Sequence, residues 1–163
     1  KQHTIMGARL FDGWESEFDE AAYQVALNHH EKWDGEGYPG HVDHRTGKAL
    51  PGYELSDGSP RGKRGEEIPL FGRIVALADV FDALASERVY KKAWEWSKVL
   101  RVIHEESGKH FDPELVEIFF SRIDVIKSIR ARYVEDPDTG SILETDAIAF
   151  SLIAADEMSE RRT

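Results

Sequence analysis

Two adjacent histidines and a distant aspartate are the residues of this chain best suited to bind metal. His29 and His30 end an amphipathic stretch, and Asp79 lies on the apolar side of a later helical pattern. Neighbouring helical residues point about 100° apart, so such a pair serves one ion poorly but can reach separate ions of a two- or three-metal cluster. A carboxylate on an apolar face needs compensation, which a metal, an arginine or a hydroxyl group can supply. The pair could equally be one core histidine beside an exposed one.

A glycine-rich turn and a basic segment could serve a ligand near these residues. Residues 34–39 read Asp-Gly-Glu-Gly-Tyr-Pro, which combines a flexible backbone with the fixed φ of the final proline. An ordinary structural turn would explain this pattern, but Tyr38 held there could also stack on a planar ligand such as a nucleobase. Arg88 and Lys91 follow the later helical pattern and could bring positive charge to the same place, or they could form a solvated helix end.

Composition limits what such a site could bind. The chain has 163 residues, enough for one domain with a core, and it contains no cysteine, so any metal must be held by histidine and carboxylate groups. The net charge of -10 disfavours a general nucleic-acid surface, and no DNA partner is expected. No apolar run approaches the roughly 18 residues of a membrane span, and no signal peptide is indicated at the start. We therefore expect a cytoplasmic protein.

Helical patterns on both sides of a long loop would position these side chains. Residues 4–11 look like the last turns of a helix. Ser16 is expected to cap the next helix, with Asp19 at capping-box spacing, and that helix ends near the paired histidines. Residues 31–67 show no sustained period and are predicted to form a long loop.

Further helices are predicted after this loop. One begins at Pro69, and the next is capped by Ser97. Another begins at Asp112 and runs to about residue 132, and Thr145 could cap a final one. The buried face of the helix after Pro69 is expected to comprise the apolar residues that recur at helical spacing: Leu70, Ile74, Leu77, Ala78, Phe81 and Leu84. The chain is therefore predicted to be all-α, a bundle of about five to six helices with a long loop.

Four segments, in this order, resemble the HD-GYP family. Residues 29–39 are similar to the HHExxDGxGYP signature of that family. Residues 68–84 look like the helix that follows the signature, and residues 86–91 and 108–113 are similar to the next two landmarks. The resemblance covers roughly residues 1–123 and implies a partial HD-domain fold.

The resemblance also implies roles for individual residues. Four positions match metal ligands of the family: His3, His29, His30 and Asp79. Three match positions that contact the nucleotide or its phosphates: Tyr38, Arg88 and Lys91. Such sites hold two or three divalent ions, commonly iron or manganese, and the implied reaction is hydrolysis of cyclic di-GMP to the linear dinucleotide or to GMP.

Two departures from the family pattern shape the remaining expectations. The His-Asp pair of the family should lie upstream and is absent from this sequence, so we expect a fragment without activity of its own. Residues 1–132 would form the partial HD-GYP domain, and residues 133–163 a helical extension. A loop insertion is expected at about residues 40–65, with His41 and His44 solvated rather than bound to metal.

The implied partners belong to bacterial signal transduction. They are cyclic di-GMP, a diguanylate cyclase (GGDEF) domain at the glycine-rich loop, and an upstream sensor or receiver domain, as in a response regulator. Apolar residues left uncovered in a fragment would favour self-association. The alternative interpretation is a degenerate regulatory module that binds nucleotide or a cyclase domain without catalysis.

Overall fold

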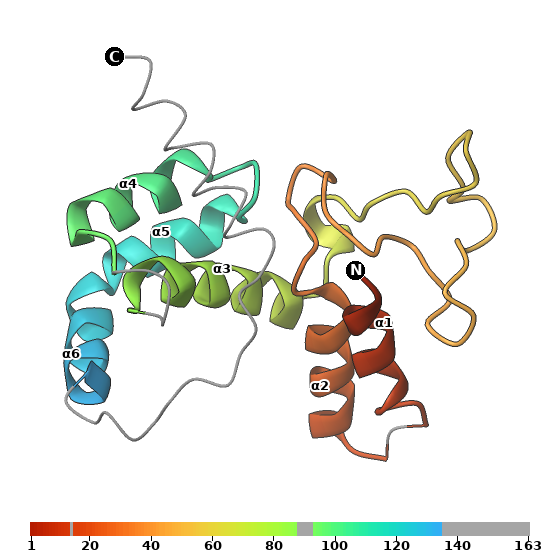
Figure 1. Ribbon diagram of the computed structural model, residues 1–163, viewed down its shortest axis with the longest axis horizontal. Helices are drawn as coiled ribbons and strands as arrows, with labels where there is room; N and C mark the ends of the chain where they lie inside the picture. Colours follow the sequence, from red (N-terminus) through yellow and green to blue (C-terminus); the bar gives the residue numbers. More distant parts are fainter. Residues whose placement is uncertain (14, 88–92, 135–163) are drawn as a thin grey trace.

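The computed structural model describes residues 1–13, 15–87 and 93–134 (Figure 1). Within these residues the chain forms six α-helices and a short 3-10 helix, and it contains no β-strand. The elements are α1 (Gln2–Arg9), α2 (Glu17–Asn28), the 3-10 helix (Gly65–Glu67), α3 (Leu70–Ala85), α4 (Trp96–Glu105), α5 (Pro113–Ser121) and α6 (Ile123–Val134). The predicted all-α fold of about five to six helices is confirmed. The helix expected at Thr145 lies outside the described residues.

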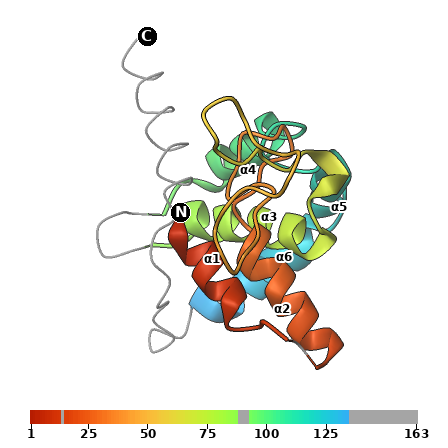
Figure 2. The same cartoon turned by 90° about the vertical axis from the view of Figure 1, so that its right-hand side faces the viewer.

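The helices form two groups joined by α3. Helices α1 and α2 lie side by side and antiparallel on one side of the molecule, and α4, α5 and α6 lie on the other (Figures 1 and 2). Helix α3 contacts α2 as well as α4 and α5. None of the described helices combines the length and the apolar character needed to cross a membrane.

Local sequence signals set two of the helix starts as predicted. The Ser16 hydroxyl caps α2 by accepting a hydrogen bond from the Asp19 N–H at 3.2 Å. The Asp112 carboxylate caps α5 by accepting from the Glu114 N–H at 2.9 Å, and Pro113 occupies the first turn. Both caps satisfy amide groups that lack a partner within the helix, so these starts depend on nearby residues alone.

Two predicted helix boundaries are wrong. Ser97 lies inside α4, because the helix begins earlier and thereby packs Trp96 edge-to-face on Phe81, with ring centroids 5.7 Å apart. The single helix expected from Asp112 to about residue 132 is divided into α5 and α6 at Arg122 (φ -116°, ψ 17°). The change of direction lets apolar side chains of α6 pack against the same core as α5.

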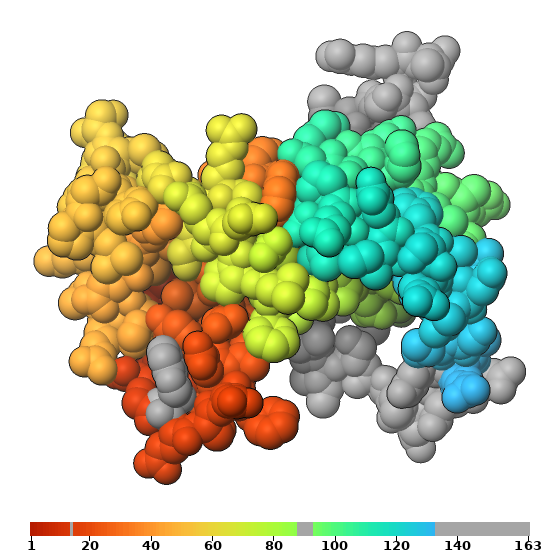
Figure 3. Space-filling model, turned by 180° about the vertical axis from the view of Figure 1, so that it is seen from behind, coloured from red at the N-terminus to blue at the C-terminus, as the bar shows by residue number. Residues whose placement is uncertain are grey.

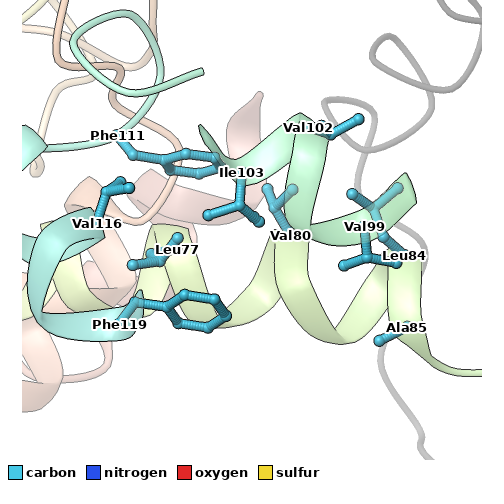
Figure 4. Packing of buried hydrophobic residues seen from close by; sticks show 10 residues of the cluster. All are labelled: Leu77, Val80, Leu84, Ala85, Val99, Val102, Ile103, Phe111, Val116 and Phe119. Atoms are coloured by element: carbon cyan, nitrogen blue, oxygen red, sulfur yellow. The ribbon is translucent and has the colours of Figure 1, made fainter. Parts of the chain in front are cut away.

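The main core lies between α3, α4 and α5. Figure 4 shows Leu77, Val80 and Leu84 of α3 facing Val99 and Ile103 of α4, with Phe111, Val116 and Phe119 closing the far end. Burial of a large apolar side chain contributes about 1.5–3 kcal/mol. This cluster therefore dominates the stability of that side of the molecule.

The predicted buried face of α3 is only partly correct. Leu77 and Leu84 are buried, but Leu70 and Ile74 are 49% and 43% exposed. The reason is a long-range contact: α2 packs on the side of Gly72, where a Cβ atom would lie 2.8 Å from the Cβ of Asn28. The buried face is therefore turned toward Gly72 and Ala76. Self-association through the exposed apolar side chains stays a prediction.

Residues 41–60 form an excursion from the bundle, which appears in Figure 1 as the orange-to-yellow loops beside α1 and α2. The His41 N–H donates to the Arg61 carbonyl at 2.9 Å and closes its base. Gly40 has φ 82°, and a Cβ atom there would lie 2.4 Å from the Arg61 carbonyl oxygen, so only glycine fits. The excursion lies within the predicted loop insertion, and its two ends lie next to each other where it leaves and returns to the helical bundle.

Candidate metal centre

Three histidines from α1 and the end of α2 meet at one point. His3 lies in α1, His29 is the C-cap of α2, and His30 follows it. One ring nitrogen of each histidine lies within 4.8 Å of one ring nitrogen of each of the others, and the Nε2 atoms of His3 and His30 are 2.8 Å apart. His30 is buried, His29 is half-buried and His3 is exposed, so the group opens to solvent on the His3 side.

The His29 ring has a fixed orientation. Its Nδ1 lies 2.8 Å from the Val25 carbonyl oxygen. A carbonyl oxygen can only accept, so Nδ1 carries the proton and donates it, and Nε2 keeps its lone pair. Ligating histidines commonly donate their second ring N–H to a carbonyl in this way. His29 is therefore in the tautomer that can coordinate a metal ion through Nε2.

The spacing of the histidines fits a shared cation. Two nitrogens at about 2.0–2.1 Å from one ion lie about 3 Å apart when they subtend a right angle at it. The 2.8 Å between the Nε2 atoms of His3 and His30 is close to that value. Without an ion, the same distance suits a hydrogen bond between one protonated and one unprotonated nitrogen. The donor set of three imidazoles matches what a chain without cysteine can offer a transition metal.

Close backbone approaches bring these side chains together. Gly7 of α1 faces Ala26 of α2, and a Cβ at Gly7 would lie 3.3 Å from the Ala26 Cβ. In the turn after the histidines, a Cβ at Gly37 would lie 2.5 Å from the Glu31 Cα. The Tyr38 N–H then donates to the His30 carbonyl at 3.1 Å. The second glycine of the signature is thus required for the chain to fold back over the site.

Tyr38, the residue predicted to contact a nucleotide, lies beside the histidines. Its ring centroid is 4.7 Å from that of His30 and 6.4 Å from that of His3. The Lys1 ammonium lies 5.4 Å from the Tyr38 ring centroid. One half-buried aromatic ring and one cation therefore border the open side of the histidine group.

Asp79 and Asp82 both belong to α3. Asp79 is half-buried in α3 and is not part of the histidine group. Asp82, one turn later, is exposed and accepts a hydrogen bond from the Ser86 hydroxyl at 2.8 Å. Arg88 and Lys91 lie outside the described residues. The structure thus brings together three of the four predicted ligands with the predicted aromatic residue.

Neither histidine of the excursion joins this group. The His41 ring stacks on Tyr53, with centroids 3.8 Å apart, and His44 Nδ1 lies 3.0 Å from the Tyr23 hydroxyl. The expectation that they do not bind metal stays a prediction. The expectation that they are solvated is wrong, because both rings are occupied by protein contacts.

A buried polar network beneath the site was missed at the sequence level. Glu31 is 1% exposed, and its carboxylate accepts from the Gly40 N–H at 2.5 Å and from the Lys63 N–H at 3.2 Å. The Lys63 ammonium donates to the Asn28 side-chain oxygen. Burial raises the pKa of Glu31 and lowers that of Lys63. The position of Glu31 directly after the paired histidines was the available signal.

The chain is similar to known HD-domain proteins. The family model described as "HD domain" matches residues 53–115. A cyclic di-GMP phosphodiesterase of Vibrio cholerae is 40% identical over 138 residues, which are 82% of this chain and 24% of that protein. A 3'3'-cGAMP-specific phosphodiesterase 2 of the same organism is 33% identical over 80% of this chain and 21% of that protein. A cyclic di-GMP phosphodiesterase of Thermotoga maritima is 37% identical over 85% of this chain and 32% of that protein.

The chain thus spans between a fifth and a third of the length of these curated relatives. HD-domain phosphodiesterases are metal-dependent, which agrees with a group of convergent histidines. The chain belongs to the HD-domain family, in its HD-GYP branch.

Proposed function

We propose that this chain is part of a metal-dependent phosphodiesterase that hydrolyses cyclic di-GMP to the linear dinucleotide or GMP. The observation that carries the proposal is the meeting of His3, His29 and His30 beside Tyr38. It combines a cation-binding donor set with an aromatic ring suited to a nucleobase. The relatives named as cyclic di-GMP phosphodiesterases support the substrate.

The three histidines would hold metal, with Asp79 as a further ligand. Bound ions would neutralise charge on the phosphate and lower the pKa of water for attack on phosphorus. We propose iron or manganese, in two or three ions, because imidazole and carboxylate groups suit such metals. The chain itself contributes the fixed His29 orientation and the buried position of His30.

The nucleotide would lie on the open side of the histidine group. Tyr38 would stack on a guanine base, while Arg88 and Lys91 would contact the phosphates. A base stacked on an aromatic side chain gains about 1–3 kcal/mol. The same turn could present a surface to a diguanylate cyclase domain, and we propose an upstream sensor or receiver domain in a cytoplasmic signalling protein.

A chimera tests this proposal. In it, this chain replaces the matching segment of the Vibrio cholerae cyclic di-GMP phosphodiesterase. We expect metal-dependent formation of linear dinucleotide or GMP by the chimera and negligible turnover by the isolated chain. A folded, metal-loaded chimera that binds cyclic di-GMP but does not hydrolyse it would contradict the enzyme assignment and favour the regulatory alternative.

Two aspartates of α3 provide a matched pair in that chimera. Asp79→Ala should abolish hydrolysis and lower the bound metal, because a missing carboxylate leaves the ions under-neutralised. Asp82→Ala should keep both, since the Asp82 carboxylate bonds the Ser86 hydroxyl at the helix end. Metal analysis and product chromatography distinguish the two. Full activity and metal in Asp79→Ala, with loss of both in Asp82→Ala, would show that the ligand lies one helical turn later.

A further inference from the structure

Helix α1 carries His3, so the contacts that α1 makes with the rest of the molecule set the position of that side chain. Leu10 ends the helix in the αR conformation, without a glycine cap. Only Thr4 and Ala8 of the helix are buried. Tertiary contacts must therefore fix the position of His3.

The excursion supplies an apolar contact to α1. Val42 is 7% exposed and forms a small buried cluster with Ala8 of α1 and Leu27 of α2. Ile5 and Tyr23 pack against this cluster from the two helices. A side chain from the excursion thus lies in the seam between α1 and α2. Figure 3, seen from behind, shows the excursion in orange and yellow directly above the red and orange α1–α2 pair.

The excursion also makes polar contacts at the end of α1. The Arg9 Nε donates to the His44 carbonyl at 2.8 Å. Arg45 Nη2 donates to the Asp12 carboxylate at 2.7 Å, and its Nε donates to the same oxygen at 3.2 Å. These hydrogen bonds hold the pKa of Asp12 below its usual value. The end of α1 and the loop after it are therefore bonded to one short segment of the excursion.

The His44 ring joins that loop to α2. Its Nδ1 lies 3.0 Å from the Tyr23 hydroxyl, and its Nε2 lies 3.3 Å from Asp12. The Tyr23 and His44 rings meet edge-to-face with centroids 5.1 Å apart. Residues 42–45, here called the clamp, thus contact α1, α2 and the loop between them.

We infer that the clamp positions the metal centre by fixing α1 on α2 and so setting the place of His3 relative to His30. The inference rests on the proposed metal centre and adds positioning residues to it. Ala8 lies five residues from His3, a rise of about 7.5 Å. Metal-ligand distances tolerate about 0.2 Å, which a tilt of about 2° over that length would exceed. A loosened clamp should therefore weaken metal binding although no clamp residue touches the ion.

The test compares two exposed aspartates of the full chain. Asp12→Ala removes the partner of Arg45, while Asp57→Ala is the matched control, since Asp57 bonds only Ser59 within the excursion among the contacts described. His44→Ala is an independent second variant, and Asp12→Asn keeps an oxygen that can accept from Arg45. The probe is Co²⁺, whose visible absorption reports the ligand set, and backbone hydrogen exchange reports on residues 2–9.

Asp12→Ala and His44→Ala should weaken Co²⁺ binding about 10-fold, as loss of outer-shell partners commonly does. Their Co²⁺ spectra should move toward that of His3→Ala, and hydrogen exchange in α1 should accelerate. Asp12→Asn should restore most of the Co²⁺ affinity and most of the protection of α1. Asp57→Ala should match wild type. Unchanged exchange and binding in both clamp variants would overturn the inference, as would faster exchange with unchanged Co²⁺ affinity. A wild-type chain that does not bind Co²⁺ through His3 would instead overturn the metal centre, and α1 exchange would then decide whether the clamp holds the helix.

Discussion

The two sides of the molecule are stabilised by different forces. On the side of α3, α4 and α5, ten buried apolar residues form one cluster. On the side that carries the histidines, the corresponding cluster of the described residues has three buried members: Ala8, Leu27 and Val42. Polar contacts hold that side together, chiefly those of Glu31 and the clamp. The candidate site thus lies where the buried apolar cluster is smallest, and its geometry depends more on hydrogen bonds.

The two sides meet through the signature turn. The Trp33 N–H donates to the His110 carbonyl at 3.1 Å, and the Asp34 N–H donates to the Lys109 carbonyl at 2.8 Å. The ion pair of the half-buried Arg73 and the buried Asp112, 2.6 Å apart, lies at the same junction. The apolar side therefore makes direct backbone contacts with the turn that follows the paired histidines.

The largest loss of stability is expected from a substitution in the apolar cluster between α3, α4 and α5. Phe111 is 1% exposed, so Phe111→Ala should lower the free energy of unfolding by about 3–5 kcal/mol through lost burial and a cavity. The matched control is Phe71→Ala, because Phe71 is 48% exposed and should change stability by less than about 1 kcal/mol. Urea unfolding followed by circular dichroism measures both. Equal losses in the two variants would contradict the assignment of the core.

A smaller loss is expected from the polar network of the site-bearing side. Glu31→Ala should cost about 2–4 kcal/mol, because it leaves two backbone N–H groups without their acceptor and removes the negative charge near the half-buried Lys63. Glu31→Gln should cost less, since it keeps one accepting oxygen. Glu66 is exposed, and Glu66→Ala serves as the control in the same urea experiment. A loss in Glu31→Ala no larger than in the control would show that this side does not depend on the network.

The smallest change in the free energy of unfolding is expected from Glu67, at the base of the excursion, and this change depends on pH. Hydrogen bonds from Arg61 and the Arg64 N–H lower the pKa of Glu67 from 4.5 to about 2. A lowered pKa in the folded state stabilises the protein above pH 4.5, and this contribution is lost as the pH falls toward 2. The side chain is 38% exposed, so screening keeps the contribution below about 1 kcal/mol.

Glu67→Gln should therefore be slightly less stable than wild type at pH 6, and the difference should shrink toward pH 2.5. Unfolding free energies across this range provide the measurement. A difference that stays constant with pH would mean that the Arg61 pair contributes nothing through the charge of Glu67.

Local signals made much of this structure predictable from the sequence, and long-range contacts limited the rest. The caps at Ser16 and Asp112 depend on residues within one turn and were predicted. The buried face of α3 was predicted only in part, because α2 packs on α3 through a contact between Gly72 and Asn28, which are far apart in the sequence. Similarly, no local pattern indicates that the excursion packs on α1.

For the candidate site, spacing alone left the paired histidines ambiguous. The resemblance to the family added His3 to the predicted ligands, and in the structure its Nε2 lies 2.8 Å from the Nε2 of His30. The buried Glu31 and the half-buried Lys63 were missed because charged residues in a loop are usually solvated. These two side chains are covered because the chain leaves the helical bundle at Gly40 and returns to it at Arg61. That path is a property of the folded backbone and not of any local sequence pattern.

Hydrogen exchange with and without Mn²⁺ tests the central claim most directly. If His3, His29 and His30 bind the ion, saturating Mn²⁺ should slow exchange in α1 and at the end of α2 by a factor of about 1 + [Mn²⁺]/Kd, while α4 and α5 remain unchanged. Replacement of any one of the three histidines by alanine should abolish most of this protection. Protection of α1 by Mn²⁺ that persists when all three histidines are replaced, or no protection in the wild-type chain, would contradict a metal centre at these residues.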